Sequence, residues 1–371
     1  MFAMKSAWTR NQNPAAAIKE LAASIQQPAI RLVMFFAAYG FNFEAVAAEL
    51  HKAFPGATTV GVTTSGEIAP GVGYTDGVIS AASFSADEFV VEPVLIENVK
   101  KNALLVRGKI TEAAGRLGLN HANGFGVMFF DWVPAVEDRL MLIVRSALPE
   151  VPLIGGTSGD NRQFKYPGKI ALNGQTYTNA ALLTLVRTNA KVFAYKENIF
   201  VPTEVELSID AADVNTRTVN RINGAPAAKA YARVVGVNES DLNLTLFMKH
   251  PLGRLLGNSV YTATPSNVTP DGGIHFFTAM MPGTKVRMLK AVNTVEAARQ
   301  TAEAIRRNLP NCKGIIGISC ICRKLQFEVE QSERAVYDAI ASVAPMVGFS
   351  SYGEQFKHHV NQTLVLLAFG D

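Results

Sequence analysis

The sequence predicts an α/β protein with two domains, built from mixed sheets with helices on their outer faces. Three observations lead to this prediction: a chain of 371 residues, a composition of 48% hydrophobic and 18% charged residues, and a strand-helix-strand pattern that occurs more than once. A single core seldom grows beyond about 250–300 residues, so the length favours two domains. The composition is that of a globular chain. A four-layer αββα arrangement is one form of this fold class.

The first part of the chain contains two copies of one unit. The tetrapeptide VMFF occurs at 33–36 and again at 127–130, which is 94 residues later, and Gly61 recurs at the same distance as Gly155. Between the tetrapeptide and the glycine, each copy has a helical stretch, EAVAAELHKAF or AVEDRLMLIVRSAL. A Thr/Ser-Gly-acid loop and a strand-like apolar run follow the glycine. This repetition predicts duplicated strand-helix-strand units.

A third copy of the unit stands near the C-terminus. CKGIIGISC predicts a strand, SERAVYDAIASVA predicts a helix, and PMVGFSSYGE and NQTLVLLAF complete the unit. Before it, NIFVPTEVELSID predicts a strand, PAAKAYARVV a helix with Pro226 in its first turn, and GGIHFFTAMMPGTKVRML a pair of strands. We therefore expect an N-terminal domain of residues 1–216, containing two repeats, and a C-terminal domain of residues 217–371.

The three Thr/Ser-Gly-acid loops allow two interpretations. Glycine permits a positive φ and the hydroxyls can bond loop amides, so a structural turn explains them. The alternative is a ligand rim shared by the repeats, with candidate residues Thr63, Ser65, Glu67, Thr157, Ser158, Asp160, Ser351 and Glu354. A nucleophilic serine is needed once per site, so three copies without a convincing Ser-His-acid order argue against catalysis.

Several protein classes are disfavoured by the composition and by the motifs. The net charge is +4 and no dense Lys/Arg patch occurs, which argues against nucleic acid as a partner. Apolar runs such as LVLLAF are far shorter than the roughly 20 residues that span a membrane. The first residues lack the apolar segment of a signal peptide, so a cytoplasmic location is expected. No P-loop, G-x-G-x-x-G or H-E-x-x-H motif is found, and no enzymatic activity is expected.

The three cysteines, Cys312, Cys320 and Cys322, lie in one short segment, so a disulfide framework is not expected. On a strand, Cys320 and Cys322 would share one face and Arg323 would lie on the other. Buried strand thiols are the default interpretation. A zinc site completed by a histidine from elsewhere and a redox or haem-thiolate role stay open.

A set of motifs resembles the FIST domain family. INGAPAAKAY, KHPLG, PGTKVRM, GISCICR and VGFSSYGEQ…NQTLVLLAF are similar to its C-terminal part, and VGVTTSGEI and LIGGTSGDN to its N-terminal part. The resemblance extends from about Arg31 to Phe369. It implies an intracellular sensory protein with a FIST N and a FIST C domain. One departure is the short segment after Glu354, which carries KHH.

Within this family, the resemblance to the bacterial haem-binding (NosP-type) members implies haem b and the sensing of nitric oxide or another diatomic gas. It also implies a histidine kinase or a cyclic-di-GMP enzyme as partner. His250 is the candidate iron ligand, because it is expected at a strand end, before Pro251 and among apolar residues from Leu244 to Leu256. Arg254 is the candidate partner of a haem propionate. A hydrogen-bonded histidine without a ligand is the alternative.

Two functions therefore stay open. The first is a haem-based gas sensor, in which nitric oxide weakens the Fe–His bond and releases the strand end towards a partner protein. The second is a haem-free FIST module that binds a small metabolite, such as an amino acid, on the three loops. In that case Glu67, Asp160 or Glu354 would face an ammonium group. A homo-oligomer is compatible with both functions.

Overall fold

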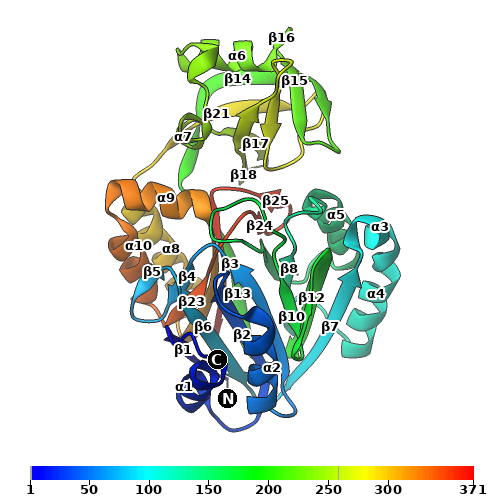
Figure 1. The fold of residues 1–371 in the computed structure, drawn as a ribbon, viewed down its shortest axis with the longest axis vertical. Coiled ribbons are helices and arrows are strands. Elements are labelled where there is room, and N and C mark those ends of the chain that lie inside the picture. Colours follow the sequence, from blue (N-terminus) through cyan, green and yellow to red (C-terminus); the bar gives the residue numbers. More distant parts are fainter. Residues whose placement is uncertain (1, 258) are drawn as a thin grey trace.

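The computed structural model describes residues 2–257 and 259–371. Figure 1 shows two parts, a larger body of three sheets and a smaller domain above it. The smaller domain is one insertion, running from about Ile199 to Val292, and the segments on either side of it form the body. The predicted α/β fold with mixed sheets is confirmed.

Each sheet of the body is built around a pair of parallel strands, β2–β3, β8–β9 or β22–β23. The first sheet consists, in spatial order, of β1 (Ala3–Thr9), β6 (Ile79–Ser85), β2 (Ile30–Ala38), β3 (Thr58–Thr64), β10 (Ile170–Leu172) and β11 (Gln175–Tyr177). The second consists of β25 (His359–Val360), β24 (Glu354–Gln355), β9 (Leu153–Thr157), β8 (Gly124–Phe130), β12 (Ala180–Thr188) and β7 (Phe89–Glu97). The third consists of β13 (Lys191–Asn198), β26 (Thr363–Gly370), β22 (Cys312–Cys320), β23 (Met346–Ser351), β4 (Glu67–Ala69) and β5 (Gly73–Thr75).

Each of the three repeats contributes one hairpin to the sheet of another repeat, in cyclic order. The β4–β5 hairpin of the first repeat extends the sheet of the third, next to β23. The β10–β11 hairpin of the second repeat pairs with β3 of the first, and the β24–β25 hairpin of the third pairs with β9 of the second. The body therefore has approximate threefold symmetry, and the third repeat belongs to the same unit as the other two.

One apolar core fills the space between the three sheets. Phe36, Phe129 and Phe349, one from each sheet, meet there with ring centroids 5.1 to 6.1 Å apart. Gly156 lies beside them, and a Cβ at this position would stand 2.6 Å from the Phe349 ring. Because cores are packed to near crystal density, the large ring in one repeat requires glycine at the equivalent place in another.

Helices cover the outer faces of the body, as predicted. The first sheet carries α1 (Pro14–Ile25) and α2 (Phe43–Ala53). The second carries α3 (Val99–Asn102), the 3₁₀ turn η1 (Ala103–Leu105), α4 (Val106–Leu117) and α5 (Glu137–Ala147). The third carries α8 (Thr294–Asn308), α9 (Ile321–Glu330) and α10 (Glu333–Ala341). Three sheets, rather than one back-to-back pair, thus share the core.

The VMFF repeat is one residue out of structural register. In the first copy Met34 and Phe36 face the shared core, whereas in the second copy Val127 and Phe129 do so. The equivalent positions are therefore 93 residues apart on these strands, not 94. A shift of one residue exchanges the two faces of a strand. Both faces are buried here and all four residues are apolar, so either register buries them equally well.

The smaller domain contains one sheet with its own apolar core. Its strands are β14 (Phe200–Asp213), β15 (Thr218–Ile222), β16 (Ala225–Pro226), β17 (Leu252–Leu256), β18 (Ser259–Ala263), β19 (Pro265–Val268), β20 (Ile274–Phe276) and β21 (Lys285–Ala291). Its helical segments are α6 (Ala227–Val235), the 3₁₀ turn η2 (Glu239–Asp241) and α7 (Leu244–Lys249). The predicted boundary at 216–217 falls between β14 and β15, which are paired neighbours.

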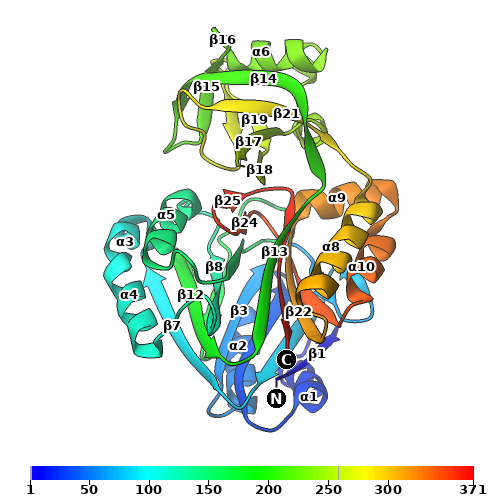
Figure 2. The same cartoon turned by 180° about the vertical axis from the view of Figure 1, so that it is seen from behind.

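Two chain segments join the smaller domain to the body, and they lie side by side. Figure 2 shows β13 of the body running directly into β14. The return segment follows β21, and the Val292 amide donates to the Ile199 carbonyl at 2.8 Å. A double connection at one point permits a hinge motion of the smaller domain against the body. In the described part of the chain, no helix is both long and apolar enough to cross a membrane.

Candidate functional site

The Thr/Ser-Gly-acid loops of the three repeats meet at one end of the shared core, and we call residues 63–67, 157–160 and 350–354 the loop hub. Backbone hydrogen bonds of 2.9 to 3.1 Å join every pair of loops, from Gly159 N to Thr63 O, Ser65 N to Ser350 O, and Thr157 N to Gly353 O. All eight side chains of the predicted ligand rim lie in this hub, and none is more than 2% exposed. Their role in ligand binding stays a prediction.

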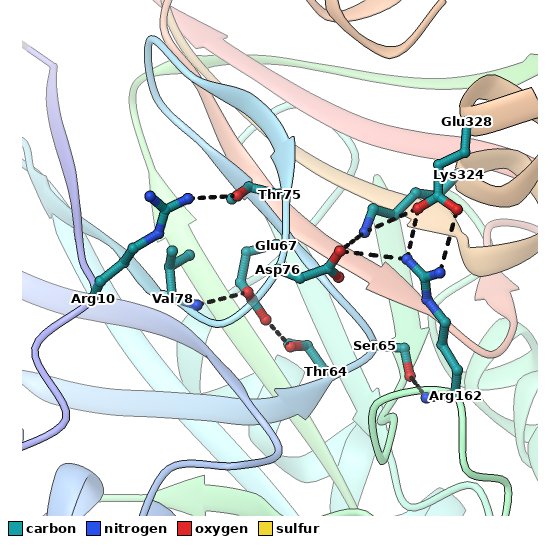
Figure 3. Close-up of polar contacts among 10 residues, drawn as sticks. All are labelled: Arg10, Thr64, Ser65, Glu67, Thr75, Asp76, Val78, Arg162, Lys324 and Glu328. Carbon is teal, nitrogen blue, oxygen red and sulfur yellow. Dashed lines mark hydrogen bonds and ion pairs between the residues drawn. The ribbon is translucent and has the colours of Figure 1, made fainter. Parts of the chain in front are cut away.

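Glu67 holds the start of a strand in the first repeat. Its carboxyl group is hydrogen-bonded to the Thr64 hydroxyl and accepts the Val78 amide at 3.1 Å, directly before β6 (Figure 3). Burial raises the pKa of Glu67 to about 8, and these two hydrogen bonds only partly oppose it. At neutral pH the group is therefore mostly protonated, which makes it a poor partner for a ligand ammonium group.

Glu354 does the same in the third repeat. It accepts the Ser351 hydroxyl at 2.5 Å and the Thr363 amide at 3.2 Å, at the start of β26. Burial raises its pKa well above the ordinary range. Two of the three loop acids thus have equivalent structural roles, as the turn interpretation of the loops predicts.

Asp160, in the shorter second loop, has a different role. Its carboxylate accepts the amides of Phe164, Lys165 and Tyr166 at 2.9, 2.7 and 2.8 Å, and also the Tyr352 hydroxyl. Burial acts to raise the pKa of Asp160, but these hydrogen bonds outweigh it and hold the pKa below the ordinary value. Asp160 therefore shapes the loop that follows it.

In the second repeat, Asp131 has the role that Glu67 and Glu354 have in the other two, which is to accept the amide at the start of a strand. It follows β8 directly and accepts the Asn179 amide at 2.5 Å, just before β12. Burial raises its pKa. The acid that starts the last strand thus comes from a different position in this repeat, which leaves Asp160 available for the loop.

A network of four charges closes the outer side of the hub (Figure 3). Lys324, whose side chain is only 2% exposed, forms ion pairs with Asp76 and, at 3.5 Å, with Glu328. Arg162 joins the same two acids at 3.4 and 2.7 Å. Gly66 beneath them has a φ of 121°, and a Cβ there would stand 2.8 Å from an Asp76 oxygen. The two cations and two anions come from all three repeats and neutralise one another. The outer side of the hub therefore needs no charged ligand to balance it.

An interdomain cleft of about 250 Å³ separates the hub from the smaller domain. Thr157 and Tyr352 of the hub line it on the body side. The Phe164 ring stacks on Tyr352 at 4.2 Å, and Trp132 meets Tyr352 edge-on at 5.7 Å. Phe277, from the smaller domain, lies 6.5 Å from Phe164. Aromatic side chains from both parts of the molecule thus face this cleft.

Phe164 is held in an unfavourable backbone conformation at the edge of the cleft. Its φ is +50°, in the left-handed region, and its side chain is 40% exposed. Asp160 holds its amide, as described above. Ala135, which also lines the cleft, has a φ of +51°. Non-glycine residues in this region cost of order 1–3 kcal/mol each and are concentrated at binding and switch sites.

The polar groups of the cleft are largely paired with one another. Arg217 forms ion pairs with Glu137 at 2.6 Å and Asp138 at 2.9 Å, and it donates to the Phe277 carbonyl at 2.9 Å. His275 is hydrogen-bonded to the Thr218 hydroxyl at 2.7 Å through its Nδ1. The cleft therefore contains an ion-paired wall and one histidine with a free ring edge.

His359 is a buried member of the cleft wall. Its Nε2 lies 3.2 Å from the Phe277 carbonyl and its Nδ1 lies 3.1 Å from Gln355 Nε2. Burial lowers its pKa, so the ring is neutral at pH 7. His359 connects the body to the smaller domain, and both of its ring nitrogens already have a hydrogen-bond partner.

His250 does not lie at a strand end, and that prediction was wrong. Helix α7 ends at Lys249 and His250 is its C-terminal cap. Phe247 faces the core of the smaller domain, whereas Leu255 and Leu256 are 44% and 48% exposed. These apolar side chains do not form one surface around His250, and iron ligation by His250 stays a prediction.

Arg254, the candidate partner of a propionate, lies on a strand of the smaller domain. On β17 it is the cross-strand partner of Tyr261, and Asp138 of the body acts on its charge. The helical conformation before His250 follows from Asn243, whose side chain caps α7 by accepting the Leu246 amide at 3.1 Å. That asparagine was the sequence signal for a helix at this place.

The cysteines do not share a strand face either. β22 ends at Cys320 and α9 begins at Ile321, so Cys322 lies in the first turn of a helix. Arg323 is fully buried in that helix and forms an ion pair with Glu197. All three cysteines are free thiols. Among residues 2–257 and 259–371, no group of three or more His, Cys, Asp or Glu could hold a metal ion.

Of the residues that line the cleft, Thr157 was a candidate of the ligand rim, but four others were not singled out in the sequence. They stand in four distant segments, at Trp132, Phe164, Arg217 and Tyr352. Tyr352 offered one signal, because it replaces the small residue found at that place in the other two loops. Trp132 offered another, since it follows the acid directly after the second VMFF.

Comparisons with known proteins give one clear result. A family model for the FIST N domain matches residues 31–225, and one for the FIST C domain matches residues 227–357. No curated protein sequence matches the chain. Among solved structures, a chorismatase has a TM-score of 0.38 at 9% identity, covering 100% of this chain and 98% of its own. PurL of T. maritima, complexed with AMPPCP, has a TM-score of 0.21 at 8% identity, covering 100% of this chain and 72% of its own.

Both TM-scores are too low to support an argument about fold or function. The two family models, in contrast, cover most of the chain in the expected order. FIST domains are sensory domains of signalling proteins. The chain belongs to the FIST family and consists of a FIST N domain followed by a FIST C domain.

Proposed function

We propose that this FIST chain is a small-molecule sensor whose ligand binds in the interdomain cleft and changes the seating of the smaller domain on the body. The observation behind the proposal is the position of the cleft, between two parts that are joined at a single hinge. Ligand sites favour such domain interfaces. A ligand that contacts both walls in only one arrangement shifts the population towards it.

The cleft lining indicates the chemical class of the ligand. Its volume of about 250 Å³ is near the lower limit of ligand pockets, which hold about 300–1,000 Å³. Trp132, Phe164 and Phe277 provide flat apolar surfaces. Arg217 is already paired with two acids, so an anionic ligand gains little. We therefore expect a small uncharged aromatic molecule with a hydrogen-bonding edge that faces His275.

The haem hypothesis receives no support from the surroundings of His250, for the reasons given above. Nitric oxide as ligand, a histidine kinase or cyclic-di-GMP enzyme as partner, and the absence of enzymatic activity stay predictions. A sensory module acts through another protein, and the hinge-linked smaller domain offers a surface whose position a ligand can change.

The proposal is tested by thermal unfolding of the full chain against a library of small aromatic metabolites, with haemin included. A cleft ligand raises the unfolding temperature of the wild type but not of Phe164→Ala. Tyr166→Ala is the matched control, because Tyr166 lies in the same loop, is similarly exposed at 38% and does not line the cleft. A ligand that stabilises Phe164→Ala as strongly as the wild type would place the site elsewhere. A Soret band that shifts with nitric oxide would restore the haem hypothesis.

A further inference from the structure

A group of basic side chains surrounds Tyr261 at another part of the interface between the two domains. The Lys196 Nζ stands 4.5 Å from the centre of the Tyr261 ring, and the His358 ring stands 5.0 Å from it. Arg254 is its cross-strand partner, and Arg145 acts on it electrostatically. We call these five residues the Tyr261 cluster. Lys196, Arg145 and His358 belong to the body, whereas Arg254 and Tyr261 belong to the smaller domain.

Two of these cations, Lys196 and Arg254, are half-buried and have no acidic partner among the described residues. In the described part of the chain, Lys196 donates only to the Val260 carbonyl, at 2.5 Å, and partial burial lowers its pKa to about 8. The Nε of Arg254 is buried and has no hydrogen-bond partner, and burial lowers the pKa of this guanidinium group. Removing a charge from water without pairing it is disfavoured, so the partial burial of these two cations leaves the cluster electrostatically incomplete.

The acids that face the cluster do not complete it. Asp138 is the carboxylate that acts electrostatically on Arg254. It already forms an ion pair with Arg217 at 2.9 Å and accepts the Ala279 amide at 3.1 Å. Glu150 acts on Arg145 alone. Burial and the nearby arginines lower the pKa of His358, so it adds no charge at neutral pH. The cluster therefore keeps a net positive charge.

We propose that the Tyr261 cluster binds a phosphate group, either as the free ion or as part of a small phosphorylated metabolite. Lys and Arg side chains are the usual ligands of phosphate, as point charge and as planar fork. A neighbouring cavity of about 190 Å³, lined by Arg145 and Lys357, provides room for the rest of a metabolite. Because the cations come from both parts of the molecule, a bound phosphate holds the smaller domain against the body. This site lies outside the interdomain cleft and does not depend on the function proposed for that cleft.

The test is thermal unfolding of the full chain with inorganic phosphate, compared with sodium chloride at matched ionic strength. The wild type is expected to gain stability with phosphate in a saturable way, as mass action requires. Lys196→Met and Arg254→Met are expected to bind phosphate at least about tenfold more weakly, since each loses a charge-assisted hydrogen bond. Lys191→Met, an exposed lysine at the start of the same strand as Lys196, is the control and keeps the wild-type affinity.

The unliganded variants give a second readout. Without phosphate, Lys196→Met is expected to unfold at the same temperature as the wild type or higher, because a half-buried charge without an acidic partner is removed. Equal effects of phosphate and chloride on the wild type, or equal phosphate affinity in all four proteins, would overturn the proposal. A parallel titration with glucose 6-phosphate separates the two sources: tighter binding than inorganic phosphate assigns a phosphorylated metabolite, and weaker binding assigns the free ion.

Discussion

The loop hub and the half-buried Tyr261 cluster are both polar, and both join segments that are distant in the sequence, yet they differ in how their ionisable groups are paired. The hydroxyls of Ser158 and Ser350 have no hydrogen-bond partner in the hub, but its acids do. In the hub, Glu67 and Glu354 each have a hydroxyl and an amide as partners from the same repeat. In the cluster, Lys196 and Arg254 have no carboxylate partner. Ionisable groups that their own chain satisfies stabilise the fold, whereas cations left without a counter-charge indicate where an anionic ligand completes the structure.

The largest expected effect concerns the complete region. Glu354→Ala leaves the Ser351 hydroxyl and the Thr363 amide buried and unpaired, and is expected to lower the free energy of unfolding by about 3 kcal/mol. Urea denaturation measures this value. Glu303→Ala, on the exposed face of α8, is the control and changes it by less than about 0.5 kcal/mol. A similar loss in both variants would mean that the hub acid has no special structural role.

A pH series examines the second hub acid. The pKa of Glu67 is raised from 4.5 to about 8, so its stabilising contribution is present below pH 4.5 and is lost as the pH rises to about 8. Glu67→Gln cannot ionise and should show a smaller fall of stability between pH 5 and pH 8, by about 3 kcal/mol. Glu354 titrates in the same direction, so the fall is reduced rather than abolished. Identical pH profiles of the variant and the wild type would contradict the burial argument.

A smaller effect on stability is expected for Asp160, the hub residue that orders the loop beside the cleft. Asp160→Asn weakens the hydrogen bonds to the amides of residues 164–166 and should cost about 1–2 kcal/mol. Hydrogen exchange of these amides should become faster, and the loop that carries Phe164 should become mobile. Asp338→Asn on the exposed side of α10 serves as control. Unchanged exchange in Asp160→Asn would remove the link between hub and cleft.

The smallest effect is expected at the charge network on the outer side of the hub. Arg162→Ala removes two ion pairs, but its side chain is 31% exposed and Lys324 still faces both acids. Partly exposed ion pairs contribute about 0–1 kcal/mol, so the free energy of unfolding should fall by less than about 1 kcal/mol. Urea denaturation in low and high salt measures it. A loss as large as that of Glu354→Ala would show that the network is as important as the buried acids.

The repeats and their helices could be predicted because their signals are local. Apolar strands, amphipathic helices and the Thr/Ser-Gly-acid loops each occupy a short continuous segment. The hairpin exchange could not be predicted, because β4, β10 and β24 contain only two or three residues and pair with another repeat. The VMFF register was ambiguous because four consecutive apolar residues carry no period of two.

The sites were harder to predict than the fold. The cleft combines Trp132, Phe164, Arg217 and Tyr352, which no spacing in the sequence connects. His250 was placed on a strand because Pro251 and the nearby leucines outweighed the Asn243 cap in the interpretation. Lys196 and Arg254 looked like ordinary basic residues, because a missing counter-charge becomes visible only after the chain has folded.

The most direct test of the account uses the two tryptophans of the chain, Trp8 and Trp132. In Trp8→Phe, Trp132 in the cleft is the sole fluorescent tryptophan, and in Trp132→Phe only Trp8 on β1 remains. A small uncharged aromatic metabolite that stabilises the chain is expected to change the emission of Trp132 in the first variant and to leave the emission of Trp8 unchanged in the second. An aromatic metabolite of this class that stabilises the chain and leaves the Trp132 emission unchanged would contradict ligand binding in the interdomain cleft.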